Sequence, residues 1–149
     1  MERSFVSENA KERERLLSLV EKLADEELIF PIGNGWTIAV ALAHLAFWDQ
    51  LALFLLRKWK KDGVQPSSID FDITNDALLS IWLAIPPRKA ANLAISSAEA
   101  IDHELEEAST ELINDIVALG EPFRLYRSIH RKQHLDEIEE FLNDMSKTW

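Results

Sequence analysis

The apolar residues of this chain recur at spacings of three and four along most of its length, and no segment shows the sustained alternation of a strand. Because that spacing is the period of an α-helix, the pattern predicts an all-α protein. The chain has 149 residues, a length that suits one domain with a sizeable core. We therefore expect a single domain over residues 1–149, folded as a four-helix bundle with one or two short extra helices.

The long helices are expected at about residues 7–24, from after Trp36 to residue 60, at 74–108 and at 122–146, with a short helix at 110–119. Turn residues at 30–35 separate the first two long helices, and Thr37 has the side chain of an N-cap for the second. Pro86 and Pro87 cannot both lie inside a regular helix, so Pro86 is expected to mark a kink or a break in the third.

Residues 38–56 form an apolar run that resembles a membrane span in length. The run contains His44, Asp49 and Gln50, and a centrally placed Asp alone costs about 3 kcal/mol to insert. A buried bundle helix is the better interpretation, so no membrane partner is expected. The first residues lead into a charged amphipathic segment without an apolar signal core, and we expect a cytoplasmic protein.

The charge balance argues against one class of partner. The net charge is −10, from 16 basic and 26 acidic side chains, whereas a surface that binds nucleic acid needs clustered positive charge. Nucleic-acid binding is therefore not expected. The chain has no cysteine, which excludes disulfides, zinc–thiolate sites and a protein thiol nucleophile, so sulfur chemistry would need an external thiol.

Three histidines are candidate metal ligands. His130 and His134 are spaced i, i+4, which places both on one face of the last helix, on a stripe that continues as apolar core. His44 shares a face with Val40 and Trp48, the latter interpreted as core rather than pocket wall. Two imidazoles one turn apart can share a metal ion with a third ligand from another helix. This pattern predicts a three-histidine site with open coordination positions.

Other interpretations remain open. A histidine pair at this spacing also arises by chance on a solvated face, and a core histidine is more often hydrogen-bonded than metal-bound. His103 lies on the opposite side of its helix from Ile101 and is expected to be exposed. His44 lies about 10 Å along its helix from Thr37, and the midpoint of His130 and His134 lies about 15 Å along the last helix from Pro122. The two distances from the helix starts are thus similar. The three therefore meet most easily if these two helices run parallel.

Two more residues near the pair are candidates for catalysis. Glu137 follows His134 by three positions and can accept an imidazole N–H or act as a base, but it stands in an acidic run, and a solvated charge is the preferred interpretation. Arg127 shares the histidine stripe. It is the best placed of the nearby arginines to bind a carboxylate or thiolate of a substrate, and the alternative is pairing with surface acids.

The same residues resemble a known family. Pro31-x-x-x-Gly35-Trp36-Thr37, then Ala43-His44-Leu45, then His130-x-x-x-His134 in the last helix are similar to the DinB/YfiT-like superfamily, over about residues 12–141. The resemblance implies a four-helix bundle, a homodimer, and a divalent metal, often nickel or zinc, held by His44, His130 and His134. Characterised relatives, typically bacterial, include isomerases and S-transferases that use a low-molecular-weight thiol. The Pro86-Pro87 break has no place in the family pattern and bears on the pocket wall.

The leading hypothesis is a metal-dependent enzyme that acts on a small-molecule substrate. Thiol transfer, thiol-assisted isomerisation and hydrolysis are the expected reaction classes, in that order, with a low-molecular-weight thiol as cosubstrate. The alternative is a non-catalytic small-molecule-binding or dimeric interaction protein with the same bundle. Neutral histidines suit nickel, zinc, copper and iron almost equally, so the sequence leaves the metal open, together with the substrate and the thiol.

Overall fold

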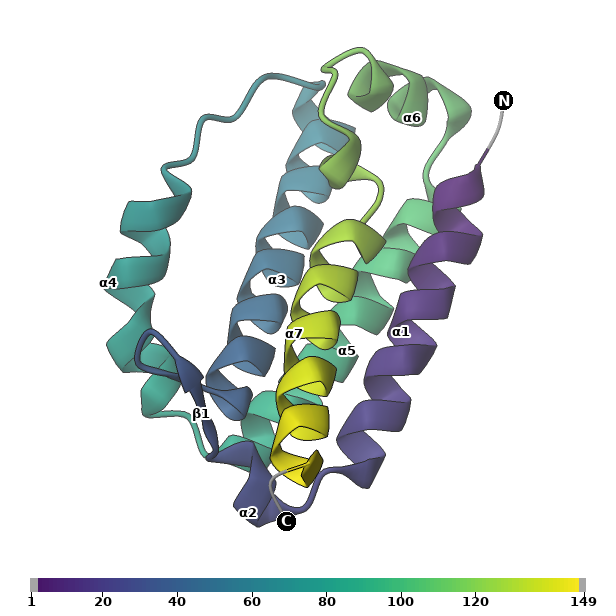
Figure 1. Ribbon diagram of the computed structural model, residues 1–149. Helices are drawn as coiled ribbons and strands as arrows, with labels where there is room; N and C mark the ends of the chain where they lie inside the picture. Colours follow the sequence, from purple (N-terminus) through teal and green to yellow (C-terminus); the bar gives the residue numbers. More distant parts are fainter. Residues whose placement is uncertain (1–2, 148–149) are drawn as a thin grey trace.

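The computed structural model of the protein describes residues 3–147 and confirms the all-α architecture. Four long helices form a bundle: α1 (Ser4–Lys22), α3 (Ile38–Asp62), α5 (Pro87–Glu107) and α7 (Ser128–Lys147) (Figure 1). The connections hold more short elements than expected. These are α2 (Asp25–Leu28), α4 (Phe71–Leu83), α6 (Thr110–Val117), the 3-10 turn η1 (Pro122–Arg124) and a hairpin of β1 (Pro31–Gly33) and β2 (Trp36–Thr37).

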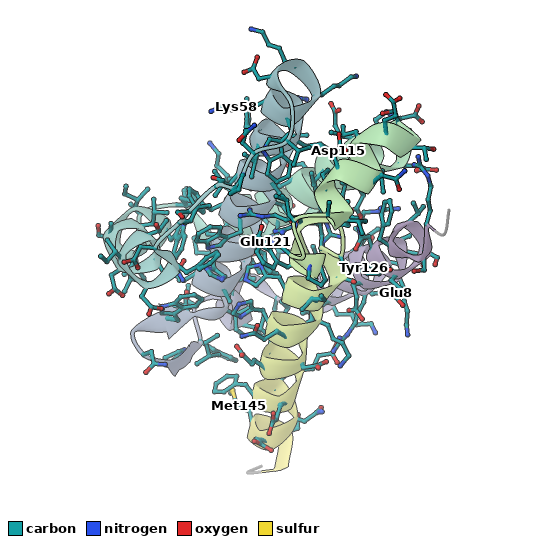
Figure 2. All side chains as sticks on the ribbon, turned by 90° about the horizontal axis from the view of Figure 1, so that it is seen from above. Glu8, Lys58, Asp115, Glu121, Tyr126 and Met145 are labelled. Atoms are coloured by element: carbon teal, nitrogen blue, oxygen red, sulfur yellow. The ribbon has the colours of Figure 1, made fainter. Side chains whose placement is uncertain are left out.

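Helices α3 and α5 point in one direction, and α1 and α7 point in the other (Figure 1). Arg57 near the end of α3 pairs with Glu104 near the end of α5 at 3.2 Å, as parallel helices require. After α3 the chain must therefore run back along the bundle before α5 can begin, and α4 forms most of this connection. It lies on the side of α3 away from α1, which Figure 2 shows along the bundle axis.

Two predicted helix boundaries are confirmed. The Thr37 hydroxyl accepts a hydrogen bond of 3.1 Å from the Val40 amide, so Thr37 is the N-cap of α3. Pro86 marks a complete break, because α4 ends at Leu83 and α5 begins at Pro87. Proline is favoured at the first position of a helix, where its missing N–H would have no partner.

Two local predictions are wrong. Pro122 begins the 3-10 turn η1, and the last helix starts only at Ser128. The expected parallel course of α3 and α7 is also wrong, since they are antiparallel (Figure 1). Both errors share one cause: the sequence pattern places residues 122–127 in the last helix, but they form η1 and the connection that follows it. As a result, Arg127, just before α7, pairs with Asp49 in the middle of α3, and the histidine pair lies within the first turns of α7.

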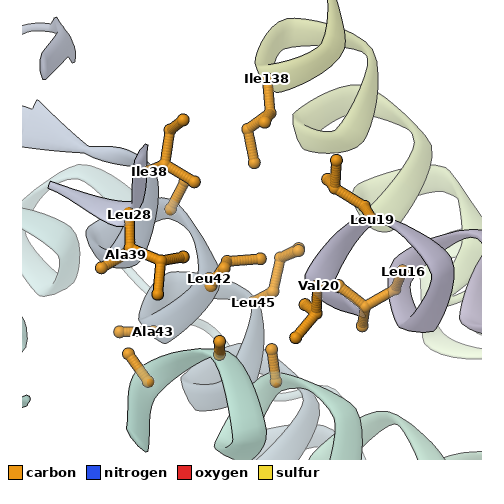
Figure 3. Packing of buried hydrophobic residues seen from close by; sticks show 14 of the residues in the cluster. Leu16, Leu19, Val20, Leu28, Ile38, Ala39, Leu42, Ala43, Leu45 and Ile138 are labelled. Carbon is orange, nitrogen blue, oxygen red and sulfur yellow. The ribbon is translucent and has the colours of Figure 1, made fainter. Parts of the chain in front are cut away.

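The core consists of two apolar clusters along the bundle axis. In the first, side chains from α1, α3 and α7 converge, among them Leu16, Leu42 and Ile138 (Figure 3). The second, which includes Phe5 and Leu56, lies at the end covered by α6. Helix α3 is long and apolar enough to cross a membrane by length and composition alone, yet 72% of its most apolar stretch is buried inside the protein. Its composition is that of a central bundle helix.

A layer of buried polar residues separates the two clusters. Arg131 is 0% exposed and donates hydrogen bonds of 2.8 Å to both carboxylate oxygens of Asp102 on α5. It also pairs with Asp49 on α3 at 3.3 Å, and Arg127 donates from Nε to the other oxygen of Asp49 at 2.9 Å. Arg13 on α1 completes the layer through Asp102. Buried charges persist only when they are paired in this way.

Candidate metal centre and pocket

The structure brings the three predicted histidines together. His44 comes from the second turn of α3, and His130 and His134 come from the first turns of α7. Each offers a ring nitrogen, and these nitrogens all lie within 4.8 Å of one another. Nε2 of His44 is 2.8 Å from Nε2 of His130. His44 and His134 are buried and His130 is half-buried. His103, by contrast, is exposed on α5, as expected.

Glu137 orients one of the three rings. Its carboxylate oxygen Oε2 lies 3.2 Å from Nδ1 of His134. When Nδ1 carries the proton and donates to Glu137, Nε2 of His134 keeps a free lone pair, which is the form that binds metal. The interpretation of Glu137 as a solvated charge is thus incomplete: the side chain is 53% exposed, but it holds the imidazole.

The environment keeps these imidazoles neutral. Burial lowers the pKa of His44 to about 3, and the neighbouring His134 contributes, while Asn75 opposes the shift. Burial also lowers the pKa of His130, assisted by the two other histidines and then by Arg127 and Arg131. The pKa of His134 is lowered by burial and partly restored by Glu137. Neutral imidazoles are the state that a metal ion needs.

A pocket of about 440 Å³ opens beside the histidines. This volume is within the range of small-molecule sites. The hairpin supplies Trp36, whose ring centroid is 4.8 Å from that of His44. Aromatic and polar side chains form the other walls: Trp48, Phe71, Asn75, Phe123, Gln133 and the three histidines. Trp48 is therefore both buried and part of the wall, and its indole N–H donates to Asn75 at 2.9 Å.

The structure separates the three arginines of this region. Arg127 lines the pocket and pairs with the buried Asp49, so the alternative of pairing with a surface acid is wrong. Arg131 belongs entirely to the polar layer and does not line the pocket. Arg124 lines the pocket and pairs with Glu121 at 3.0 Å. Of the three, Arg127 remains the best placed to meet a ligand.

One of the comparisons with known proteins identifies the family of the chain. A family model described as the DinB superfamily matches residues 8–145. The chain belongs to the DinB superfamily. No curated protein and no solved structure matches it significantly. The matched span includes the three clustered histidines.

The residues present fit the divalent metal that the DinB superfamily implies. Three neutral imidazoles are a ligand set for nickel, zinc and related ions, and the pocket leaves room for further ligands. Metal-binding histidines usually donate a hydrogen bond from their second ring nitrogen to a carboxylate or carbonyl, and Glu137 provides such a carboxylate for His134.

Sequence reasoning missed the pocket residues contributed by the connections, above all Asn75 and Phe71 of α4. The sequence around these two residues has no regular spacing of apolar side chains that would identify them as pocket residues. A helix outside the bundle does not need such a continuous buried face. The role of Asp49 did have a signal. An acid inside an otherwise apolar run demands a buried partner, and Arg127 is that partner.

Proposed function

We propose that this DinB protein is a metal-dependent enzyme acting on a small molecule. One observation carries the proposal: three neutral imidazoles from two helices converge within 4.8 Å at a pocket large enough for a substrate. Structural zinc sites are closed by four protein ligands, whereas three ligands with an open position are typical of catalytic sites.

His44, His130 and His134 would hold the ion, with nickel or zinc as the expected metal. A divalent ion bound there would lower the pKa of a water or thiol ligand, so that a nucleophile forms near neutral pH. Glu137 holds His134 in place. The rings of Trp36 and Trp48 pack beside His44, with centroids 4.8 Å and 6.4 Å from that of its imidazole.

The proposed reactions are thiol transfer, thiol-assisted isomerisation and hydrolysis, in that order. The chain has no cysteine, so the nucleophilic sulfur must belong to a cosubstrate, a low-molecular-weight thiol. The family resemblance supports this choice, and the pocket volume allows a small electrophile. Arg127 is the candidate for positioning the substrate.

A second candidate function is a non-catalytic binding protein for a small molecule. One observation favours it: no carboxylate lines this pocket within residues 3–147, so no side chain besides the histidines is placed as a general acid or base. Without a metal, the same pocket would bind a ligand and not transform it. Thiol-dependent turnover of an electrophile separates the two functions.

Metal content is the deciding experiment. Untagged protein should contain close to one nickel or zinc ion per chain by elemental analysis. His130→Ala/His134→Ala should contain none, and the matched control His103→Ala, which changes the exposed histidine of α5, should equal the wild type. A wild type that is empty and refuses added nickel and zinc would overturn the proposal. A loaded wild type then justifies a screen for thiol-dependent turnover.

The assembly and the setting of the protein are proposals of the same kind. The family resemblance supports a homodimer, which light scattering should show as twice the chain mass of 17.1 kDa. The cytoplasm is the proposed compartment. The net charge of −10 argues against nucleic-acid partners, and the burial of α3 argues against a membrane partner.

A further inference from the structure

We propose that the pocket binds a carboxylate-bearing molecule with an aromatic body, and that Arg127 receives the carboxylate. The inference deepens the proposed function by naming a ligand class for the same pocket. It rests on that pocket being a ligand site and does not require a metal.

The charges around the pocket differ from those of the whole chain. The protein has a net charge of −10, yet the pocket lining includes Arg124 and Arg127 and, within residues 3–147, no aspartate or glutamate. Arg124 is offset by Glu121, which lies outside the lining. The lining therefore carries positive side chains and no negative ones, a distribution that favours an anionic ligand.

Arg127 has a hydrogen-bond donor that its protein partners do not use. Its Nε donates to Asp49 at 2.9 Å and its Nη1 donates to the Phe123 carbonyl at 3.1 Å. Its Nη2 makes no hydrogen bond within the described part of the chain. Asp49 is shared with Arg131, and Arg131 shares Asp102 with Arg13.

The buried part of the layer holds the guanidinium groups of Arg127 and Arg131 against the carboxylates of Asp49 and Asp102. Arg127 is the member of this layer that lines the pocket, and its Nη2 is a donor that the layer leaves unused. A ligand carboxylate on Nη2 would accept a charge-assisted hydrogen bond. A neutral amide or alcohol would accept a weaker one, because it brings no negative charge.

The walls next to Arg127 suit an aromatic body. The rings of Trp48 and Phe71 have centroids 5.1 Å apart, and those of Phe71 and Phe123 are 6.3 Å apart. These distances are typical of aromatic pairs that favour edge and offset contacts. The three side chains come from three different elements and line the same pocket, where they offer aromatic surface against which a flat ring can pack.

Tryptophan fluorescence and calorimetry can test the proposal on metal-free full-length protein. Benzoate and phenylacetate are the probes, with benzamide and phenylacetamide as neutral partners of the same shape. We expect each acid to bind at least tenfold more tightly than its amide. Arg127→Gln should weaken acid binding at least tenfold and leave amide binding unchanged.

Arg57→Gln is the matched control, because it removes an exposed arginine of α3 that does not line the pocket. We expect it to change acid binding less than threefold. Circular dichroism verifies the fold of each variant. If Arg127→Gln does not fold, Arg127→Lys keeps the charge without the planar fork and should retain acid binding with a several-fold loss.

Equal affinity for acids and amides would overturn the proposal, as would acid binding that survives Arg127→Gln in a folded protein or a wild type that binds neither acid. Metal content of the same samples tests the enzyme proposal separately. Acid binding to a protein that refuses metal would keep this inference and remove the metal centre. If the acids bind only after metal loading, and Arg127→Gln does not change their binding, the metal centre would be kept and this inference would be removed.

Discussion

Nε2 of His44 on α3 lies 2.8 Å from Nε2 of His130 on the antiparallel helix α7. At that distance the two nitrogens share a hydrogen bond, so one of them carries the proton and the other must accept it. The two nitrogens therefore cannot both be protonated. The pair therefore resists full protonation, in agreement with the lowered pKa of each ring. Two predictions about the histidine cluster follow from its neutral imidazoles and from the contact of His134 with Glu137.

Metal-free protein should lose stability as the pH falls from 7.5 to 5.5. The unfolded histidines take up protons near pH 6.5, whereas folded His44 does so only near pH 3. The unfolded state thus binds more protons across this window, and the free energy of unfolding falls with the pH. Urea unfolding at the two pH values measures the loss.

The variant His44→Gln should show a smaller difference between the two pH values than the wild type. His103→Gln is the matched control, since it changes an exposed histidine on α5, and it should keep the full difference. Comparing each protein with itself at two pH values cancels the general cost of a substitution. A wild-type urea midpoint that is equal at both pH values would contradict the account.

Removing the carboxylate of Glu137 should weaken metal binding. In Glu137→Gln the charge that holds the proton on Nδ1 of His134 is lost, and we expect about a tenfold loss of metal affinity. Competition with a chromophoric chelator measures it. Glu140→Gln, an exposed glutamate on the same helix, should have wild-type affinity. Equal affinities in both variants would show that the contact does not matter.

Arg131→Met should be strongly destabilising. The substitution removes the cation that joins Asp49 to Asp102 in the polar layer, and breaking a buried pair costs about 3–5 kcal/mol. Lys132→Met changes the next residue, an exposed cation paired with Asp136, and should cost at most about 1 kcal/mol. Urea unfolding at pH 7.5 compares the two. Similar losses would argue against a special role for the layer.

Thr37→Ala should destabilise the protein by about 1 kcal/mol, because the Val40 amide loses the hydroxyl that accepts its hydrogen bond. Thr37→Ser keeps that oxygen and should recover most of the stability. Thermal unfolding of the three proteins checks the order. A serine variant as weak as the alanine variant would mean that the threonine methyl group, and not the cap, stabilises this position.

The sequence predicted the bundle because helical periodicity records which face of each long helix is buried. It failed where packing leaves no such record. Asn34 and Gly35 have positive φ angles of 56° and 78° and form the tight turn of the hairpin, but strands of two or three residues are too short to alternate visibly. An Asn-Gly pair is a hairpin signal in its own right, so this element could have been predicted.

The same limit applies to the site. Spacing on a helix brings His130 and His134 together, and the inward face of α3 supplies His44, so the histidine cluster was predictable. Helix direction was not, because it depended on where α7 begins. Asn75 and Phe71 reach the pocket through the return path of α4, a long-range arrangement that no local pattern encodes.

The pocket combines parts of two kinds. The three histidines stand on long helices fixed by the core, whereas Trp36, Phe71 and Phe123 come from the hairpin, α4 and η1. Substitutions in these connections can reshape the cleft while leaving the bundle and its imidazoles intact. A lineage with this architecture can acquire new ligands through few mutations and keep the histidine cluster that it inherited.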